Sequence, residues 1–459
     1  MKKALLSLLI LMVVTMVSAA EYASLYEGLP IELKQPELPS ISNQRVSITD
    51  FGATGDGQTL CTEAIQKAID DLAGRGGGHV DVPAGIWLTA PFKLKSGIDL
   101  HLAKNAIIQL TEDRGMHVRE GQKKAVFAIT ATDAHDVSIT GSGIIDGNGE
   151  FWRAVKRGKQ SDVEWREYLA LGGTVNERGD LWYPFNLKHQ GNIAPTMEQQ
   201  ERMRVNMVRF TNCQRVLVQG VTLQNSPKFH LTPNDCQDVT IDGVTVRCPW
   251  NAQNGDAIDI GTCQRVLITN CVIDCGDDGI CMKGATGDEA LNHKPCEDIL
   301  ITGNTVFHAH GGFVIGSEFS AGMYRIVVCK NTFSGTDTGL RFKSAIGRGG
   351  KTGDIYCYDI NMTDIKDQAI VFETSYADKA VSGTTGPAAG TKWVPEFKDI
   401  HIYNVVCNRT KTGIKAKGAA GMVHDIDISN STIFYTQSAT DIDGACDVKL
   451  KDVKLITYK

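Results

Sequence analysis

Three aspartates lie in short polar segments whose spacing suggests that they meet in the folded chain. Asp256 ends the segment Asn-Gly-Asp, and Asp277 and Asp278 form the segment Gly-Asp-Asp about one structural repeat later. Carboxylates that pack together repel, which raises the pKa of at least one and keeps that group protonated as a general acid. Another stays ionised and can activate water. Hydrolysis of a glycosidic bond uses such a pair.

Two further motifs carry complementary charges. His310 holds the matching place one repeat later, in His-Gly-Gly-Phe, and Arg341 and Lys343 follow on the next repeat. Residues two apart in a strand share a face. The Arg341 guanidinium can grip a substrate carboxylate through two hydrogen bonds, and Lys343 adds a point charge. These residues alone predict a hydrolase whose partner is an acidic polysaccharide.

Each motif also has an ordinary structural interpretation. Gly and Asp are preferred turn formers, so both aspartate segments could be plain turns. His310 could pack within a turn, and Arg341 and Lys343 could be a solvated strand face. Their occurrence in register on four consecutive repeats favours one shared site.

The repeat itself predicts the fold. Short alternating β-branched segments recur from position 216 at intervals of 22–33 residues, apart from one of 45, and begin at Val216, Val239, Val266, Ile299, Ile326, Ile355, Ile400, Ile426 and Val448. A second set interleaves with them and begins at Ala257, Gly279, Gly312, Gly339, Ala369 and Gly413. Two or more short strands per repeat, with no helical pattern between them, favour an all-β, right-handed parallel β-helix over a propeller or a leucine-rich repeat.

The inward-facing residues of the second set follow from strand alternation. They are expected to line one internal face: Ile258, Ile260, Ile280, Met282, Phe313, Ile315, Leu340, Phe342, Ile370 and Phe372. Their alternates, among them Asp259 and Lys283, are expected to point outward. The aspartate segments precede such strands, so the solenoid stacks them.

One helix is expected, at the N-terminal end of the solenoid. Ile65, Ala68, Ile69 and Leu72 have helical spacing, and the glycines from position 74 stop the run. An amphipathic helix there would cap the open core. Residues 46–459 are predicted as a single domain after an extension at 21–45. An aromatic-rich insertion at about 151–200 and a Gly/Thr/Ser-rich stretch at 377–392 are predicted as loops beside a groove.

The first 20 residues predict a signal peptide. Lys2 and Lys3 precede a short apolar run, and Ser18, Ala19 and Ala20 suit a cleavage site. We expect an exported protein, periplasmic or extracellular, with no stable membrane insertion after cleavage. The 459 residues carry a formal charge of −6 without a long basic run, so no nucleic-acid partner is expected. A monomer is predicted.

The 13 cysteines allow two interpretations. An exported chain invites disulfides, but the count is odd. Four cysteines recur in one local context, which favours half-buried thiols stacked as a ladder: Cys213, Cys236, Cys263 and Cys296. No zinc site is expected from the loosely spaced Cys271, Cys275 and Cys281, which have no His partner.

At the charged motifs the sequence resembles glycoside hydrolase family 28, the polygalacturonases, and in particular its exported bacterial members. The likeness runs from about Val46 onward. It includes Phe51-Gly-Ala-Thr-Gly-Asp-Gly and the four motifs at Asn254–Asp256, Gly276–Asp278, Ala309–Gly311 and Arg341–Lys343. Three positions depart from the family pattern: Gly255 stands for Thr, and Ala257 and Ala309 stand for Gly.

This resemblance implies inverting hydrolysis of α-1,4-galacturonosyl bonds in pectin. It makes Asp277 the general acid and lets Asp256 and Asp278 hold the attacking water. It assigns to His310 the role of supporting the protonation state of the acid. It also assigns the binding of substrate, chiefly of a galacturonate carboxylate, to Arg341, Lys343, Lys283, Glu318 and Tyr376. It requires no cofactor and no metal.

Several alternatives stay open at this point. The insertion and the loop after Tyr376 could wall off one groove end, which tilts the prediction toward exo action. The polymer could be a substituted pectin such as rhamnogalacturonan or xylogalacturonan, although the intact Arg-x-Lys favours galacturonate. The aspartates could instead bind Ca²⁺ in a pectate lyase. A non-catalytic glycan-binding or adhesive β-helix is the third class.

Overall fold

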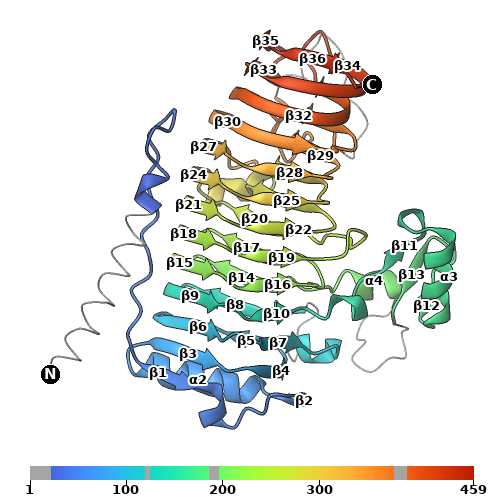
Figure 1. Ribbon diagram of the computed structural model, residues 1–459. Helices are drawn as coiled ribbons and strands as arrows, with labels where there is room; N and C mark the ends of the chain where they lie inside the picture. The colour runs from blue at the N-terminus through green and yellow to red at the C-terminus, as the bar shows by residue number, and fades with distance from the viewer. Residues whose placement is uncertain (1–21, 119–124, 186–195, 377–389, 459) are drawn as a thin grey trace.

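The computed structural model describes residues 22–118, 125–185, 196–376 and 390–458 (Figure 1). The predicted signal peptide at 1–20 lies outside them. Within these ranges, no helix is both long and apolar enough to cross a membrane.

The described chain forms a parallel β-helix, which confirms the predicted fold. Its strands stack in three ladders, and every pairing in these ladders is parallel. Each coil runs from the first ladder to the second and then to the third. The first ladder holds β1 (Arg45–Ser47), β3 (Gly78–Val82), β6 (Ile98–Leu102), β9 (His135–Gly141), β15 (Gln214–Gln219), β18 (Gln237–Asp242), β21 (Gln264–Thr269), β24 (Cys296–Thr302), β27 (Met323–Cys329), β30 (Thr352–Thr363), β32 (Phe397–Lys417), β33 (Val423–Ser429) and β35 (Val448–Lys451).

The other two ladders complete each coil. The second holds β2 (Asp56–Leu60), β4 (Gly85–Thr89), β7 (Ala106–Leu110), β10 (Ile144–Asp146), β16 (Thr222–Gln224), β19 (Thr245–Arg247), β22 (Val272–Asp274), β25 (Thr305–Phe307), β28 (Thr332–Ser334), β34 (Thr432–Ile442) and β36 (Lys454–Thr457). The third holds β5 (Phe92–Lys93), β8 (Ile129–Thr132), β14 (Val208–Thr211), β17 (Leu231–Asn234), β20 (Ile258–Gly261), β23 (Asp278–Lys283), β26 (Gly311–Ile315), β29 (Thr338–Lys343) and β31 (Gln368–Glu373). The long strands β30, β32 and β34 continue through more than one ladder.

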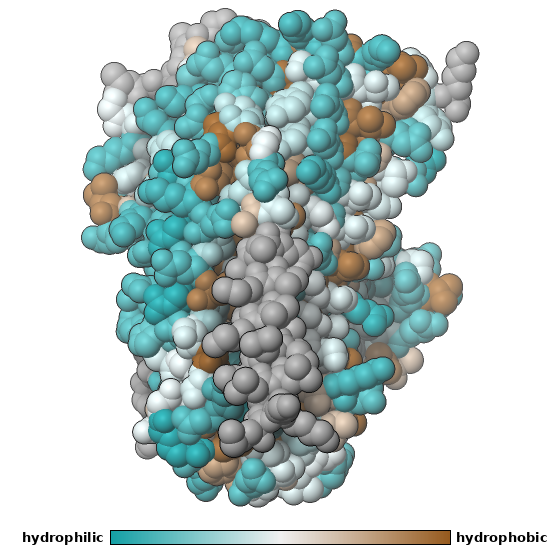
Figure 2. All heavy atoms as spheres, turned by 60° about the vertical axis from the view of Figure 1, so that its left-hand side comes forward, coloured by the Kyte–Doolittle hydropathy of each residue, from teal (hydrophilic) through white to brown (hydrophobic). Residues whose placement is uncertain are grey.

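The third ladder stacks its apolar residues as the alternation predicts. Ile280 pairs with Phe313, Phe313 with Leu340, and Leu340 with Ile370. All ten residues predicted for this internal face are buried. The rings of Phe342 and Phe372 stack with their centroids 4.6 Å apart. The interior is apolar, whereas the side chains on the face shown in Figure 2 are mostly hydrophilic.

The predicted capping helix is α2 (Thr62–Gly74). It buries Ile65, Ala68, Ile69 and Leu72 against the first coil, and it ends at Gly74 as expected. The extension before β1 lies along the first ladder (Figure 1). Its apolar residues pack on the outer residues of that ladder, for example on Leu267 and Leu300.

The insertion contains regular structure as well as loops. It comprises β11 (Val155–Lys156), α3 (Asp162–Ala170), β12 (Thr174–Val175), β13 (Leu181–Tyr183) and α4 (Met197–Glu201). The strands form a small antiparallel sheet, and Ser161 and Glu164 make a capping box at the start of α3. The remaining helical turns are η1 (Ile48–Phe51), η2 (Arg114–His117), η3 (Gly149–Phe151), η4 (Arg157–Lys159) and η5 (Gly287–Asn292). Most of the predicted loop at 377–392 lies outside the described residues.

All 13 cysteines are free thiols, and all but the half-buried Cys446 are buried. The backbone N–H of Cys213 donates to the sulfur of Cys236, and that of Cys236 donates to the sulfur of Cys263, each over 3.4 Å. The ladder interpretation is therefore confirmed, and the disulfide interpretation is wrong for this structure.

Truncation of the stacked core ring should destabilise the solenoid. Phe372→Ala leaves a cavity in a close-packed interior, so we expect the free energy of unfolding to fall by about 3–5 kcal/mol in urea titrations. The same change at the partly exposed Phe434 should cost clearly less. Equal losses at both positions would contradict the register described above.

Candidate functional site

The predicted catalytic residues lie on neighbouring turns between the second and third ladders. Asp256 lies between β19 and β20, Asp277 directly precedes β23, Asp278 begins β23, and His310 directly precedes β26. The parallel register places Asp278 beside Gly311. The backbone N–H of His310 donates to the carbonyl of Asp277 over 2.7 Å. The stacking predicted from the repeat is thus present.

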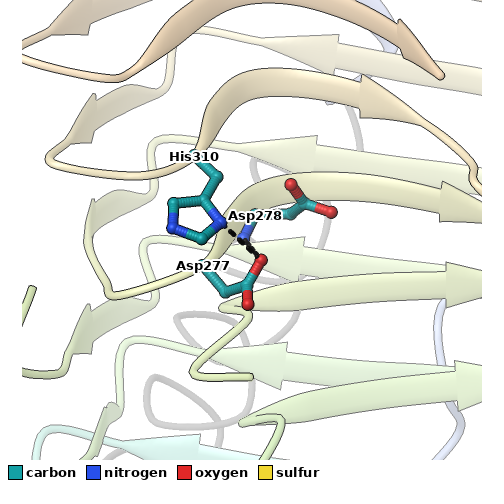
Figure 3. A group of neighbouring side chains, drawn as sticks. All are labelled: Asp277, Asp278 and His310. Atoms are coloured by element: carbon teal, nitrogen blue, oxygen red, sulfur yellow. Dashed lines mark hydrogen bonds and ion pairs between the residues drawn. The ribbon is translucent and has the colours of Figure 1, made fainter. Parts of the chain in front are cut away.

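Asp277 and His310 form a direct pair (Figure 3). His310 Nδ1 lies 2.9 Å from Asp277 Oδ1, which also accepts the Asp278 backbone N–H over 3.1 Å. The other oxygen, Oδ2, accepts the Asn254 backbone N–H over 3.2 Å. Burial raises the pKa of Asp277, but the hydrogen bond and charge of His310 outweigh it, and the net pKa is below the ordinary value.

Asp278 is surrounded by cations. Its carboxylate lies 2.7 Å from Lys343 Nζ, 3.4 Å from Arg341 Nη1 and 3.9 Å from Lys283 Nζ, and only 1% of its side chain is exposed. Burial alone would raise the pKa of Asp278. The charges of Lys343, Lys283 and Arg341 reverse that effect and lower the pKa, so Asp278 stays ionised.

Asp256 and Asp259 behave in the opposite way. Both are buried, and the Oδ1 atom of each has no hydrogen-bond partner among the described residues. Burial, followed by the charge of Asp259, raises the pKa of Asp256 well above its ordinary value. Burial also raises the pKa of Asp259, to about 7. A carboxyl group with a raised pKa is present, as expected. In the free protein, however, the raised pKa belongs to Asp256 and Asp259 and not to Asp277.

The predicted binding residues join the same cluster. Tyr376 lies under two cations, with its ring centroid 5.4 Å from the Arg341 guanidinium carbon and 4.9 Å from Lys343 Nζ. Lys283 donates to the Gly316 carbonyl over 2.9 Å and lies 3.7 Å from Glu318. All nine predicted site residues are therefore brought together by one face of the third ladder and its turns.

Sequence reasoning missed five residues that contact or support this cluster: Asp259, Arg348, Lys159, Arg204 and His230. Alternation placed Asp259 on the same face, but the sequence did not show that its carboxylate is buried. Arg348 donates to the Tyr376 carbonyl over 2.8 Å. Lys159, from the insertion, places Nζ 3.5 Å from His310 Nε2. Arg204 was not foreseen either, and no local motif marks it.

Arg204 and His230 hold the Asp256 turn in place. Arg204, just after α4, donates to the Gln253 carbonyl over 2.7 Å and to the Asn254 side-chain oxygen over 3.0 Å. The buried His230 accepts the Ser226 backbone N–H at Nε2, so its Nδ1–H donates to the Asp256 carbonyl over 2.9 Å. The insertion thereby supports a turn that lies two coils away.

The only described group with ligand atoms close enough for a metal ion is Asp277, Asp278 and His310, within 4.8 Å of one another. Two carboxylates and an imidazole could offer three ligand atoms to a divalent cation. However, Lys343, Arg341 and Lys283 already balance the charge of Asp278, and His310 Nδ1 is engaged by Asp277. The fit to a metal is therefore poor, and the arrangement suits acid–base chemistry on an anionic ligand.

Comparisons with known proteins agree with this geometry. The sequence model of the family described as "Glycosyl hydrolases family 28" matches residues 160–450, more than half of the chain. An exo-poly-α-D-galacturonosidase of Dickeya chrysanthemi is 29% identical over 78% of this chain. The match covers 61% of that relative, less than two thirds of its length. A probable polygalacturonase of Vitis vinifera is 26% identical over 95% of this chain and 84% of its own.

Solved structures share the fold. A hyperthermoactive exopolygalacturonase of Thermotoga maritima superposes with a TM-score of 0.74 at 28% identity, covering 92% of this chain and 94% of its own. A family 28 exopolygalacturonase of Yersinia enterocolitica gives a TM-score of 0.66 at 23% identity, covering 90% and 79%.

Substitution of Asp259 should change how stability depends on pH. An unfolded Asp ionises near pH ~3.9, whereas folded Asp259 holds its proton up to a pKa of about 7. The folded protein therefore loses stability as the pH rises through that window. Asp259→Asn should raise the free energy of unfolding by about 1–4 kcal/mol at pH 8 and give no such gain at pH 3. The same change at the exposed Asp452 is the control and should alter the free energy of unfolding by no more than about 0.5 kcal/mol. An equal gain at both pH values for Asp259→Asn would contradict the burial of a titrating carboxyl group at this position.

Proposed function

Because this chain belongs to glycosyl hydrolases family 28, we propose that it hydrolyses α-1,4-galacturonosyl bonds of pectin with inversion. As a member of the family it is a glycoside hydrolase. One observation carries the choice of an acidic polymer: three cations, Arg341, Lys343 and Lys283, gather around the single carboxylate of Asp278 on one face of the solenoid. A neutral glycan would not require these cations next to the reaction centre.

Asp277 acts as the general acid in this proposal. Its Oδ1 accepts from His310 and from the Asp278 backbone, whereas Oδ2 accepts one longer hydrogen bond, from the Asn254 backbone, so the proton for the leaving oxygen is placed on Oδ2. The pKa of Asp277 is lowered in the free protein. A bound polyuronate excludes water and adds negative charge, and both effects raise that pKa toward the protonated form. Substrate binding thereby favours the protonated form of Asp277, which the general acid requires.

Asp278 and Asp256 hold the attacking water. Asp278 is ionised and accepts the proton of the water as it attacks the anomeric carbon. Asp256 has a raised pKa, so its protonated carboxyl donates a hydrogen bond to the oxygen of the same water. One glycosidic bond breaks, one C–O bond forms, Asp277 loses a proton and Asp278 gains one.

Arg341 and Lys343 have different roles: Arg341 binds the substrate, and Lys343 stabilises the ionised base, Asp278. The side chain of Lys343 is 4% exposed and lies 2.7 Å from Asp278, so it chiefly keeps that carboxylate ionised. The Arg341 side chain is 16% exposed and lies 3.4 Å from Asp278, which leaves donors for a substrate carboxylate. The Tyr376 ring lies against the Arg341 guanidinium, and Arg348 lies over the same ring.

Exo action is favoured within this proposal. The insertion reaches the turn edge of the site at His310 and Asn254 through Lys159 and Arg204. A wall at that edge limits how an internal stretch of polymer can enter. Relatives named exo-poly-α-D-galacturonosidase and exopolygalacturonase support the same choice.

We further propose that the protein is exported to the periplasm or the medium. The basis is the pattern at residues 1–20, with two lysines, an apolar run and a small-residue cleavage motif.

Removal of the acid should abolish most turnover. Asp277→Asn keeps the shape and the acceptor oxygen but cannot deliver a proton, so kcat on de-esterified homogalacturonan should fall at least ~10²-fold. Asp274→Asn is the matched control, because Asp274 is half-exposed near the same turn and pairs with His308 outside the cluster. Unchanged turnover with persistent polymer binding would favour a non-catalytic β-helix.

The products should distinguish exo from endo action and show the stereochemistry of the reaction. We expect small galacturonate units from the first minutes, with β configuration at the new anomeric centre by proton NMR. An early ladder of mixed oligomers would contradict exo action. Ultraviolet-absorbing unsaturated products and loss of activity with a chelator would instead indicate a calcium-dependent lyase.

A further inference from the structure

A cavity opens on the outer face of the third ladder, away from the catalytic cluster. It has a volume of about 540 Å³ and is lined by residues of β5, β8 and β14 together with the segment around Phe127. These strands lie below β17 and β20 in Figure 1, on the N-terminal side of the site. None of its lining residues belongs to the proposed catalytic or binding set.

The ionisable side chains that line this cavity are all positively charged. Lys93 and Arg209 are its ionisable lining residues, and no Asp or Glu lies among them. Three threonines add hydroxyl groups to the wall: Thr130, Thr132 and Thr211. Two cations, several hydroxyls and an aromatic ring are the groups that recognise a sugar bearing a carboxylate.

Arg209 is the central group. Its guanidinium lies over the ring of Phe127, 5.0 Å from the centroid, and Nε lies 3.2 Å from the Thr211 hydroxyl. No carboxylate within the described ranges forms an ion pair with it. The side chain is half-buried, and this desolvation lowers its pKa. The charge of Asp235 acts on Arg209 only at longer range, without an ion pair, so an anionic ligand would supply the direct counter-charge.

Arg209 also borders a cavity of about 460 Å³ that leads toward the catalytic cluster through Asp259, Lys283 and Glu318. Several acids line that connecting cavity, yet most are already compensated. Asp235 accepts from His293 over 2.6 Å and from the Thr262 hydroxyl over 2.7 Å. Glu318 lies 3.7 Å from Lys283. A polyanion can therefore cross this part without meeting a row of free carboxylates.

We propose that the cavity around Arg209 binds a uronate unit of the same polymer chain whose cleaved bond lies at Asp277. This inference rests on the proposed function. From β14 to β23 the ladder takes three steps through β17 and β20, about 14 Å at the usual strand spacing. The cavity is thus a distal subsite, several sugar units from the reaction centre.

Chain-length dependence tests this subsite. We would measure kcat/KM for trigalacturonate and octagalacturonate with the full-length protein and with Arg209→Gln. The octamer should lose about 10- to 100-fold, which is the scale of one charge-assisted hydrogen-bonded pair, and the trimer should change less than about twofold. Arg209→Lys should recover part of the loss. Lys330→Gln, which removes an exposed cation from the turn between β27 and β28, should behave as wild type.

Two results would overturn the proposal. An octamer as active on Arg209→Gln as on wild type means that the cavity does not contact the substrate. Equal losses for trimer and octamer mean that Arg209 acts on the reaction centre or on the fold.

Equilibrium binding separates this inference from the proposed function. In the Asp277→Asn background, calorimetry should show one octagalacturonate per protein, with a Kd at least tenfold higher when Arg209→Gln is added. Two bound octamers would show a separate site and contradict the single-chain arrangement. Wild-type protein that binds the octamer through Arg209 but never cleaves it would defeat the proposed function while leaving the cavity intact.

Discussion

The central contacts of the site depend on the parallel register of the solenoid. The backbone returns to the same position after each coil, so a residue acquires neighbours from one repeat before and one repeat after. Asp278 meets Arg341 and Lys343 only because β23, β26 and β29 pair in register, with Met282 beside Ile315 and Ile315 beside Phe342. A slip of one residue in any of these strands would turn the cations into the core and the phenylalanines into the groove. The apolar interior therefore selects the geometry of the charged exterior.

The charges of the cluster are balanced within the protein. A buried carboxylate is tolerated when cations and donors surround it, as at Asp278, and it otherwise keeps its proton, as at Asp256 and Asp259. Neighbouring aspartates on adjacent coils thus acquire opposite protonation states from their surroundings alone. In the proposed mechanism this separation leaves Asp278 able to accept the proton of the water while Asp256 donates a hydrogen bond to it. By linkage, Asp278 stabilises the fold at neutral pH, whereas the buried Asp256 and Asp259 act against it.

Much of this could be predicted from the sequence because a solenoid repeats. The spacing of the β-branched segments predicts the coils, and alternation predicts which residues, such as Phe313 and Leu340, face inward. The same period predicts that Asp256, Asp277 and His310 lie together on neighbouring coils. What the sequence could not show was the protonation order, since that depends on how deeply each carboxyl is buried and on which cations reach it. Alternation indicated that Asp259 faces outward, but not that its side chain is buried.

The residues that escaped prediction share a cause. Lys159 and Arg204 belong to an insertion with no periodicity, so nothing in its own pattern says which coil it will touch. The strands cannot vary freely, because each must keep the register that stacks its neighbours. Turns carry no such restriction, and an insertion between the second and third ladders lies on the edge from which Asp256, Asp277 and His310 project. Length added at this edge reaches the reaction centre without disturbing the core, as the contacts of Lys159 with His310 and of Arg204 with Asn254 demonstrate. In this architecture the ladders therefore hold the chemistry constant, while the turns are the part through which access to it can change.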